Sequence, residues 1–397
     1  MRRHLDEIRK AAEQGDAEAQ CNLGERYDKG EGVPQDLEEA VKWYRRAAEQ
    51  GNAIALYNLG SCYAYGEGVS EDKMESARWY HRAAELGQPD AQYCLGKCYE
   101  NGEGVSEDKM ESVKWYRKAA EQKHAAAQYN LGWCYDNGEG IPADKEEALE
   151  WYHKAAEQGS SLAQYALGGY YFYGKGVPKD LEEAEKWYRK AAEQGHATAM
   201  CRVGLWYARE DYARDKDTPE DQAEQVKWYR KAAEQGNAIA QFNLGESYFR
   251  GWGVPKDEAE AVTWFRKAAE QGNDKAQYEL GLCYFHGEGV PADNAEAIKW
   301  FHQAATKKYG NANVKYMLGK CYADGKGGPE DKAEAVKWFR EAEDGGFHIG
   351  AWYRLGLCYL KGEGVLEDKA EAIRLFRRAA EHGHDGAMET LRKMGIR

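Results

Sequence analysis

The stretch DAEAQCNLGERYDKGEGVPQDLEEAVKWYRRAAEQG, residues 16–51, decides the fold because the chain repeats it from end to end. Its Leu-Gly pair recurs about every 36 residues through 397 residues, with spacings of 41, 38 and 37 residues in the second half. A fixed period of this length is the signature of a repeat array. The pairs are Leu23-Gly24, Leu59-Gly60, Leu95-Gly96, Leu131-Gly132, Leu167-Gly168, Val203-Gly204, Leu244-Gly245, Leu280-Gly281, Leu318-Gly319 and Leu355-Gly356.

This spacing predicts one continuous array with a half-unit at each end. An N-terminal capping half-repeat is expected at residues 1–15 and a C-terminal capping helix at 384–397. Gly66–Ser76 and Gly102–Ser112 are identical (GEGVSEDKMES), which indicates growth by duplication. The predicted repeats are 16–51, 52–87, 88–123, 124–159, 160–195, 196–236, 237–272, 273–310, 311–346 and 347–383.

Each repeat begins with a pattern typical of an amphipathic helix. In residues 16–29 the apolar side chains of Ala17, Leu23 and Tyr27 recur at helical spacing. The helix is expected to end at Gly30-Glu31-Gly32, because glycine permits the positive φ of a tight turn.

A second helix follows the glycine turn in every repeat. Asp36 and Glu39, three residues apart, predict a capping box at its start. The helix is expected to run through Trp43 and Tyr44 and to end at Gly51. Equivalent boxes are Asp72/Glu75, Asp108/Glu111, Asp144/Glu147, Asp180/Glu183, Asp221/Glu224, Asp257/Glu260, Asp293/Glu296, Asp331/Glu334 and Asp368/Glu371.

Charged side chains on the second helices predict a solvated outer face. Glu38 with Lys42, and Glu182 with Lys186, lie four residues apart and are expected to form ion pairs. Inside, Gly24 and the Ala47-Ala48 pair are small enough to let helices approach and leave room for the aromatic rings. One hairpin buries too little surface to order itself, so neighbouring hairpins must stack.

The pattern Ala-x-x-x-Leu-Gly-x-x-Tyr-x-x-Gly-x-Gly-Val, then Asp-x-x-x-Ala-x-x-Trp-Tyr-x-x-Ala-Ala-Glu-x-Gly, resembles the Sel1-like repeat. That family is a relative of the tetratricopeptide repeat. The resemblance implies an all-α fold, a right-handed α/α superhelical solenoid with the first helices inside. It also implies a non-enzymatic scaffold or adaptor whose partner is a protein or peptide of unknown identity.

If the first helices line a concave groove, two sets of their side chains face it. One position, three residues before the Leu-Gly glycine, is aromatic in eight of ten repeats. Two further positions vary and gather apolar groups in repeats four to eight, as a peptide-binding groove requires. The alternative is that these rings fill gaps between neighbouring first helices. The candidates are Tyr57, Tyr93, Tyr129, Tyr165, Phe242 and Tyr278, with Trp133, Phe172, Leu205, Phe249, Leu282 and Phe285.

Asparagine recurs two residues before the same glycine. Asn58, Asn130 and Asn243 are candidates for hydrogen bonds to the backbone of a bound peptide. They are equally consistent with solvated residues at the edge of a groove.

Composition excludes several classes of partner. The net charge of −13 disfavours nucleic acid and anionic lipid, and no apolar stretch is long enough to insert into a membrane. Residues 1–10 lack the apolar core of a signal peptide, so we expect a cytoplasmic protein, with signal-less secretion left open. The sequence leaves the oligomeric state unknown, and we expect a monomer.

No catalytic motif, cofactor or metal site is predicted. The sequence lacks Gly-x-Ser-x-Gly, a phosphate-binding loop and His-Glu-x-x-His. Of nine cysteines, six share one helix position, which indicates reduced, buried thiols; Cys94 and Cys98 alone are too few for a metal ion. His81, His153 and His302 share one second-helix position and are expected at the surface.

Two alternatives and one irregularity remain open. The scaffold could act through its acidic outer face or its ends, in self-assembly or in contact with a host protein. A remote alternative is a hydrolase such as a β-lactamase, suggested by a cysteine-paired branch of the family whose pairing this chain lacks. In repeat six, residues 208–220 (AREDYARDKDTPE) replace the glycine turn with a charged loop, which marks either a functional site or a tolerated insertion.

Overall fold

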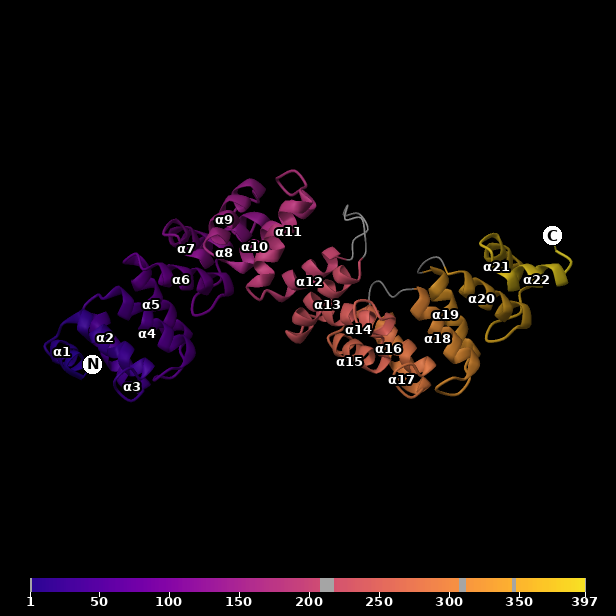
Figure 1. The fold of residues 1–397 in the computed structure, drawn as a ribbon, viewed down its shortest axis with the longest axis horizontal. Coiled ribbons are helices and arrows are strands. Elements are labelled where there is room, and N and C mark those ends of the chain that lie inside the picture. Colours follow the sequence, from indigo (N-terminus) through magenta and orange to yellow (C-terminus); the bar gives the residue numbers. More distant parts are fainter. Residues whose placement is uncertain (1, 208–217, 307–311, 345–347, 397) are drawn as a thin grey trace. The chain divides into compact units, whose positions relative to one another are not determined.

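The computed structural model describes residues 2–207, 218–306, 312–344 and 348–396. These residues form 22 helices and no strand, so the predicted all-α solenoid of helix hairpins is confirmed (Figure 1). The first helices of the repeats are α2 (Ala17–Lys29), α4 (Ala53–Tyr65), α6 (Pro89–Asn101), α8 (Ala125–Asn137), α10 (Ser161–Tyr173), α12 (Ala197–Tyr207), α14 (Ala238–Arg250), α16 (Asp274–His286), α18 (Ala312–Asp324) and α20 (Ile349–Lys361). The second helices are α3 (Leu37–Glu49), α5 (Lys73–Glu85), α7 (Lys109–Glu121), α9 (Lys145–Glu157), α11 (Leu181–Glu193), α13 (Pro219–Glu234), α15 (Glu258–Glu270), α17 (Asn294–Ala305), α19 (Lys332–Asp344) and α21 (Lys369–Glu381). The flanking helices are α1 (Arg2–Glu13) and α22 (Asp385–Lys393).

The chain divides into two compact units. Met1–His196 contains α1 to α11, and Ala197–Arg397 contains α12 to α22. Within each unit every helix packs on the helix before it and the helix after it. Each unit is therefore a stack of hairpins whose stability depends on nearest neighbours. The repeat boundaries given above stay a prediction.

A glycine sets the distance between the two helices of each hairpin. A Cβ on Gly24 would lie 2.7 Å from the ring of Tyr44, and a Cβ on Gly245 would lie 2.6 Å from the ring of Phe265. The ring is tyrosine in repeats one to six and phenylalanine in repeats seven to ten. The expectation that this glycine makes room for the ring holds, because any larger residue would push the helices apart.

Only half of the predicted capping box forms at the second helices. Asp36 accepts a hydrogen bond from the Glu39 N–H at 2.9 Å, as expected. The Glu39 carboxylate, however, binds Lys42 at 2.9 Å, while the Asp36 N–H donates to the Tyr27 carbonyl at 2.9 Å. The first helix therefore takes the donor that a capping box would use.

The predicted four-residue ion pairs are also wrong in register. Lys42 pairs with Glu39 rather than Glu38, and Lys186 pairs with Glu183 rather than Glu182. Three residues separate these partners, a spacing that also places side chains on one helix face.

The helix of repeat six starts earlier than its predicted cap. Thr218 caps α13, accepting from the Asp221 N–H at 3.1 Å, and Pro219 occupies the first helical position. Asp221 and Glu224 therefore lie inside the helix. Proline suits this position because the first N–H of a helix has no intrahelical partner.

Buried glutamines connect consecutive hairpins, a feature that the sequence analysis missed. Gln128 of α8 donates to the carbonyl of Ala120 in the preceding second helix at 3.1 Å. Its own amide oxygen accepts from Gln158, at the end of α9, at 2.6 Å. We call this series the glutamine ladder. Its other rungs are Gln20/Gln50, Gln92/Gln122, Gln164/Gln194 and Gln241/Gln271, and repeat two carries Leu56 and Leu86 at the same positions.

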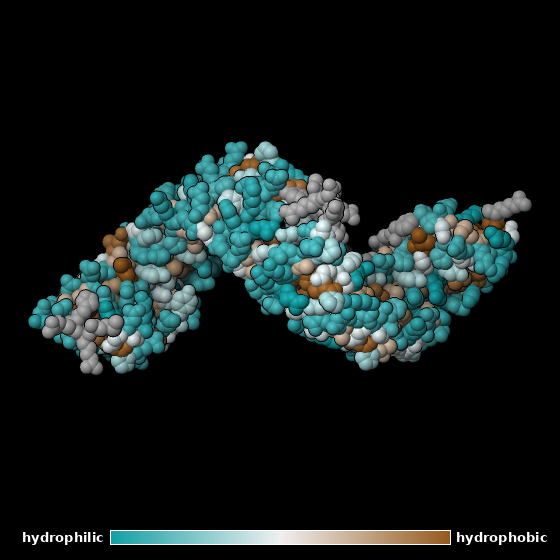
Figure 2. All heavy atoms as spheres, in the orientation of Figure 1, coloured by the Kyte–Doolittle hydropathy of each residue, from teal (hydrophilic) through white to brown (hydrophobic). Residues whose placement is uncertain are grey.

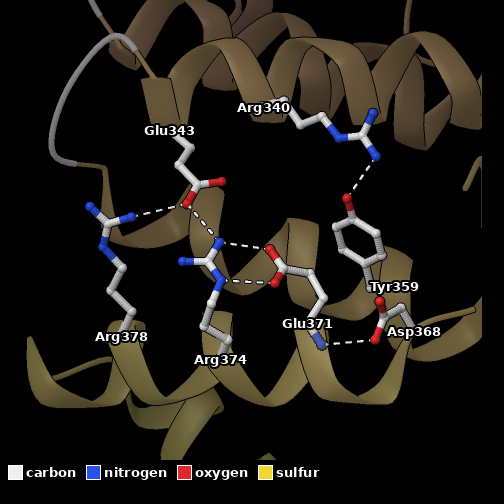
Figure 3. A network of polar contacts seen from close by, with 7 residues as sticks. All are labelled: Arg340, Glu343, Tyr359, Asp368, Glu371, Arg374 and Arg378. Atoms are coloured by element: carbon white, nitrogen blue, oxygen red, sulfur yellow. Dashed lines mark hydrogen bonds and ion pairs between the residues drawn. The ribbon is translucent and has the colours of Figure 1, made fainter.

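A second set of polar contacts joins second helices to the next repeat. Arg45 donates to the Tyr63 hydroxyl at 2.6 Å, and Arg340 donates to Tyr359 at 2.6 Å (Figure 3). His153 and His302, expected at the surface, are half-buried at this same position and contact the Tyr171 and Tyr322 hydroxyls. Burial lowers the pKa of both imidazoles, which favours the neutral form.

Figure 3 shows that salt bridges between side chains also link the last two second helices, α19 and α21. Glu343 of α19 accepts from Arg374 at 3.1 Å and from Arg378 at 3.0 Å, both on α21. Arg374 in turn holds Glu371 at 2.6 Å. These contacts fix the register of the last hairpin against its neighbour.

Hydrophilic side chains cover most of the visible face of each unit, with small hydrophobic patches between them (Figure 2). Within the described ranges, no helix is both long and apolar enough to cross a bilayer.

Candidate functional site

The predicted aromatic row lies on the first helices, and every ring in it is half-buried. Each packs one face against the ring of its own second helix, with centroids 5.5 to 6.1 Å apart. The pairs are Tyr57–Tyr80, Tyr93–Tyr116, Tyr129–Tyr152, Tyr165–Tyr188, Phe242–Phe265 and Tyr278–Phe301. The row therefore contributes to packing while it keeps part of its surface accessible.

Two rings of the aromatic row are also covered by a histidine side chain. His124 stacks on Tyr93 and His196 stacks on Tyr165, each at 4.8 Å between centroids. His124 also caps α8, accepting from the Ala127 N–H at 3.1 Å. Packing within the array thus explains the aromatic side chain at Tyr93 and Tyr165 more fully than it does at Tyr57 or Tyr129.

Packing also explains part of the variation near the ends of the first helices. The Tyr116 hydroxyl donates to Glu100 at 2.7 Å. In repeat seven the second-helix ring is Phe265, which has no hydroxyl, and Phe249 takes the place of the acid with its ring 6.3 Å away. Phe285 likewise occupies the acid's position opposite Phe301. In repeats seven and eight a phenylalanine thus lies beside a second-helix ring that has no hydroxyl, although Phe172 occupies the same position in the repeat of Tyr188.

Four other variable candidates are half-buried. Trp133 packs at the edge of the core of the first unit, and Leu282 does so in the second. The ring of Phe172 lies 4.8 Å from that of Tyr173. Leu205 lies on α12, directly after its Leu-Gly-like pair.

The three asparagines differ in their surroundings. The side chain of Asn130 hydrogen-bonds to the hydroxyls of Tyr93 and Tyr116, which lowers the pKa of each against the larger effect of burial. Asn58 is half-buried on α4. The amide nitrogen of Asn243 is buried and has no hydrogen-bond partner among the described residues. A buried donor without an acceptor is costly and needs an explanation.

An acidic pair that the sequence analysis missed lies close to Asn243. Burial, and to a smaller extent the charge of Glu246, raises the pKa of Glu279 to about 7. One oxygen of Glu246 accepts from Arg250 at 3.2 Å, whereas its Oε1 is buried without a partner in the described structure. The residues at these two positions vary between repeats, with glutamate found again only at Glu25, so no periodic signal marked them.

The cysteines show burial rather than activation. All nine are free thiols, and only Cys94 is more than slightly exposed. Burial raises the pKa of Cys62 and Cys98 to about 12, which makes both poor nucleophiles and poor metal ligands. No group of three or more potential metal ligands occurs in the part of the chain that the structure describes. Of the repeat-six loop, residues 208–217 lie outside the described residues.

Comparison with known proteins decides the family. The model of the Sel1 repeat matches the chain ten times, at residues 17–52, 53–88, 89–124, 125–160, 161–196, 197–237, 238–273, 274–309, 313–347 and 351–384. The chain belongs to the Sel1 repeat family. Among solved structures, c5321, a protective antigen of uropathogenic Escherichia coli strains with an SLR fold, is 38% identical. The match covers 99% of this Sel1 repeat chain and 84% of that chain, with a TM-score of 0.85.

A Sel1 repeat protein from Oxalobacter formigenes is 34% identical, with a TM-score of 0.55, over 80% of this chain and 89% of that chain. No curated protein matches the chain. Sel1 repeats are tetratricopeptide-like, and proteins built from them are generally non-enzymatic scaffolds for protein–protein interaction.

Proposed function

We propose that this Sel1 repeat protein is a non-enzymatic scaffold that binds a segment of a partner protein along its first helices. The accessible parts of the aromatic row supply apolar contact area. Polar atoms between them supply hydrogen bonds that fix the segment's backbone. Solenoid repeats commonly present such extended surfaces to a partner.

The observation that carries the proposal is the pair of unpartnered polar atoms on α14. Asn243 Nδ2 is a donor and Glu246 Oε1 is an acceptor, and both are buried. Half-exposed Phe242 and Phe249 lie on the same helix. A peptide backbone carries a carbonyl and an N–H in alternation, so one bound segment can satisfy both atoms.

Asn243→Ala tests this assignment. The immobilised full-length chain and its variant are used to capture proteins from native lysate, and bound proteins are quantified by mass spectrometry. We expect Asn243→Ala to reduce capture of the partner at least about tenfold without lowering thermal stability, because the buried donor has no partner to lose. Asn22→Ala is the matched control, since the Asn22 side chain already accepts from Arg26 at 3.0 Å.

A second variant tests the apolar part of the surface. The double change Phe242→Ala and Phe249→Ala, on the same helix as Asn243, is expected to abolish capture of the same partner. If both variants retain the full set of captured proteins, recognition by the first helices is wrong. A β-lactam and ester hydrolysis screen of the purified chain is expected to show no turnover; turnover abolished by a point mutation would favour the hydrolase alternative.

A further inference from the structure

Histidine caps α8, α20 and α22 and at the same time covers a tyrosine ring of the preceding first helix. His348 caps α20, and its Nδ1 accepts from the Ala351 N–H at 3.0 Å. Its ring centroid lies 4.2 Å from that of Tyr316 on α18. The same arrangement recurs at His384, which caps α22 and lies 4.3 Å from Tyr353 on α20. Both tyrosines occupy the position of the aromatic row in the last two repeats.

A glycine makes room for each of these two stacks. A Cβ on Gly350 would lie 3.1 Å from Cζ of Tyr316 and 3.2 Å from Cε1 of His348. A Cβ on Gly386 would lie at the same two distances from the second pair of rings. Both imidazoles are half-buried in this space. The histidine ring is therefore held by its hydrogen bond to the helix, by the tyrosine face and by close packing at the first turn.

The cap requires the neutral form of the imidazole. Nδ1 accepts a hydrogen bond only through its lone pair, and in the imidazolium both ring nitrogens carry a hydrogen. The positive end of the helix dipole also repels a cation at this place. Burial lowers the pKa of His348 from its ordinary value of 6.5, in the same direction. The folded state therefore binds fewer protons than the unfolded state, and the stability that the cap provides is lost as the pH falls.

Charged side chains on the helices around the two stacks have other contacts. Among the described residues, no carboxylate forms an ion pair with either histidine, and the nearby Asp344 and Asp385 are exposed. The groups with other contacts are Lys315, paired with Glu341; Lys320, beside the Tyr316 ring; Arg354, paired with Asp324; Arg378 and His382, both against Trp352; and Lys393, paired with Glu389. A proton on either imidazole therefore gains no compensating charge.

His124 provides the contrasting case. It caps α8 and stacks on Tyr93, but its Nε2 also lies 3.3 Å from a carboxylate oxygen of Asp90. Lys97 and Glu100 are the other charged groups that act on this tyrosine. An imidazolium here loses the cap but gains an ion pair, so acid changes this contact less.

We propose that His348 and His384 are acid-sensitive latches, which release the faces of Tyr316 and Tyr353 as the pH falls from about 7 to about 5. On protonation each histidine ring leaves its cap, and the first turn of the helix loses one acceptor. The tyrosine face that the ring covered becomes accessible. The last repeats thus present more of the aromatic row in acid. The latch involves no bound partner, so it does not depend on the first-helix proposal.

Hydrogen exchange of the full-length chain tests the release of the caps. Protection factors of the first turns of α20 and α22 are compared at pH 8 and pH 5, after correction for the intrinsic exchange rate. We expect them to fall at least about fivefold, because the uncapped state binds a proton that the capped state excludes. The first turns of α4 and α14, which Asn52 and Asn237 cap, are expected to change less than about twofold, because an amide does not titrate.

The chain supplies a matched substitution. His348→Asn with His384→Asn keeps an acceptor at both caps, because Asn52 and Asn237 accept from the equivalent N–H at 2.9 Å. The variant is expected to fold and to keep its helical circular dichroism. Protection of α20 and α22 in this variant is expected to change less than about twofold between pH 8 and pH 5.

Hydroxyl-radical footprinting measures the uncovered rings themselves. Modification of Tyr316 and Tyr353 is expected to rise at least about twofold from pH 8 to pH 5 in the unmodified chain. Tyr57 and Tyr129 are the internal controls, because the caps of the helices that follow them are Gln88 and Ser160, which do not titrate. Their modification is expected to stay constant.

Three outcomes overturn the proposal: protection of α20 and α22 that does not change with pH, an equal fall in the asparagine variant, or an equal fall at α4 and α14. An NMR titration that gives His348 a pKa of 6.5 or above also overturns it. None of these measurements uses a captured partner. Failure of the first-helix proposal and failure of this one are therefore separable.

Discussion

At the scale of single residues, one missing methyl group determines how closely the helices of a hairpin approach. Gly168 and Gly169 are adjacent on α10, yet their surroundings differ. A Cβ on Gly168 would lie 2.5 Å from the ring of Tyr188, whereas a Cβ on Gly169 would lie 3.7 Å from the Tyr188 hydroxyl. The first distance requires the ring or the helix to move, and the second is an ordinary contact.

Gly168→Ala is expected to lower the free energy of unfolding by about 1–3 kcal/mol, because the added methyl group overpacks the hairpin. Gly169→Ala is expected to raise it by about 0.5–1 kcal/mol through helix propensity alone. Urea unfolding followed by circular dichroism measures both. Equal effects of the two substitutions would show that the ring does not limit the helix spacing.

The raised pKa of Glu279 gives the protein a pH dependence of definite sign. Its pKa is about 7 in the folded chain, above the ordinary value of 4.5. Between these values the native state binds more protons than the unfolded state, so stability falls as the pH rises from about 4.5 to about 7. We expect this one group to contribute at most about 3 kcal/mol of that fall.

The measurement compares urea midpoints at pH 5 and pH 8. Glu279→Gln is expected to show a smaller fall than the unmodified chain. Glu246→Gln is expected to reduce the fall as well, because it removes the neighbouring charge. Parallel pH profiles of the unmodified chain and Glu279→Gln would contradict the assignment.

The sequence shows where the aromatic residues of each first helix lie, but it does not show which side chains each ring contacts. Phe249 and Phe285 lie at a position that varies between repeats, and both are predicted from the sequence as groove residues. The structure relates them to Phe265 and Phe301 on the second helices. Each of these two contacts joins positions 16 residues apart, and it can be recognised only when the two helices are known to face each other.

At the scale of elements, the glycine turns connect each repeat to the preceding one. The second glycine of the turn has a left-handed backbone in repeat one (Gly32, φ 81°) and in repeat three (Gly104, φ 72°). Their surroundings differ. A Cβ on Gly32 would lie 3.6 Å from the Leu5 side chain, whereas a Cβ on Gly104 would overlap the backbone of α5.

Gly32→Ala is therefore expected to cost about 1–2 kcal/mol, the strain of a left-handed alanine. Gly104→Ala carries the same strain and must also separate two hairpins, so we expect a loss of at least about 3 kcal/mol. Thermal and urea unfolding of both variants measure the difference. Equal losses would mean that the turn is strained but not packed.

Helices were predictable because their signals are local. Periodic alanines and rings, a capping aspartate and a terminal glycine all lie within one turn or two of the helix they define. Repeat six shows the limit, since Asp221 was the predicted cap and Thr218, directly before Pro219, caps the helix instead. The glutamine ladder was not predictable, because its hydrogen bonds join residues 8 positions apart in successive hairpins and 30 positions apart in one hairpin, which meet only after the helices have packed.

At the scale of the whole molecule, both units bury their thiols. All nine cysteines are free, and burial raises the pKa of Cys94, the most accessible, to about 11. At pH 8 the thiolate that reacts with electrophiles is therefore scarce. We expect Ellman's reagent to react with the native chain on the order of 10³-fold more slowly than with the chain in guanidinium, where nine thiols should titrate.

The matched control is Cys94→Ser, which is expected to remove most of the slow native reaction. Fast modification of any other cysteine before unfolding would show that a core opens locally. The free energy of local unfolding would then differ between repeats, although their cores are packed alike.

The glutamine ladder has a consequence for how such a chain changes length over generations. The glutamine of the first helix donates to a carbonyl at the end of the preceding second helix, and six repeats offer the same donor at the same place. Unequal recombination that gains or loses one complete 36-residue unit therefore restores each of these hydrogen bonds with a new neighbour. A partial insertion leaves a buried amide without a mate, so selection should tolerate changes in copy number far better than frame-preserving indels of intermediate size.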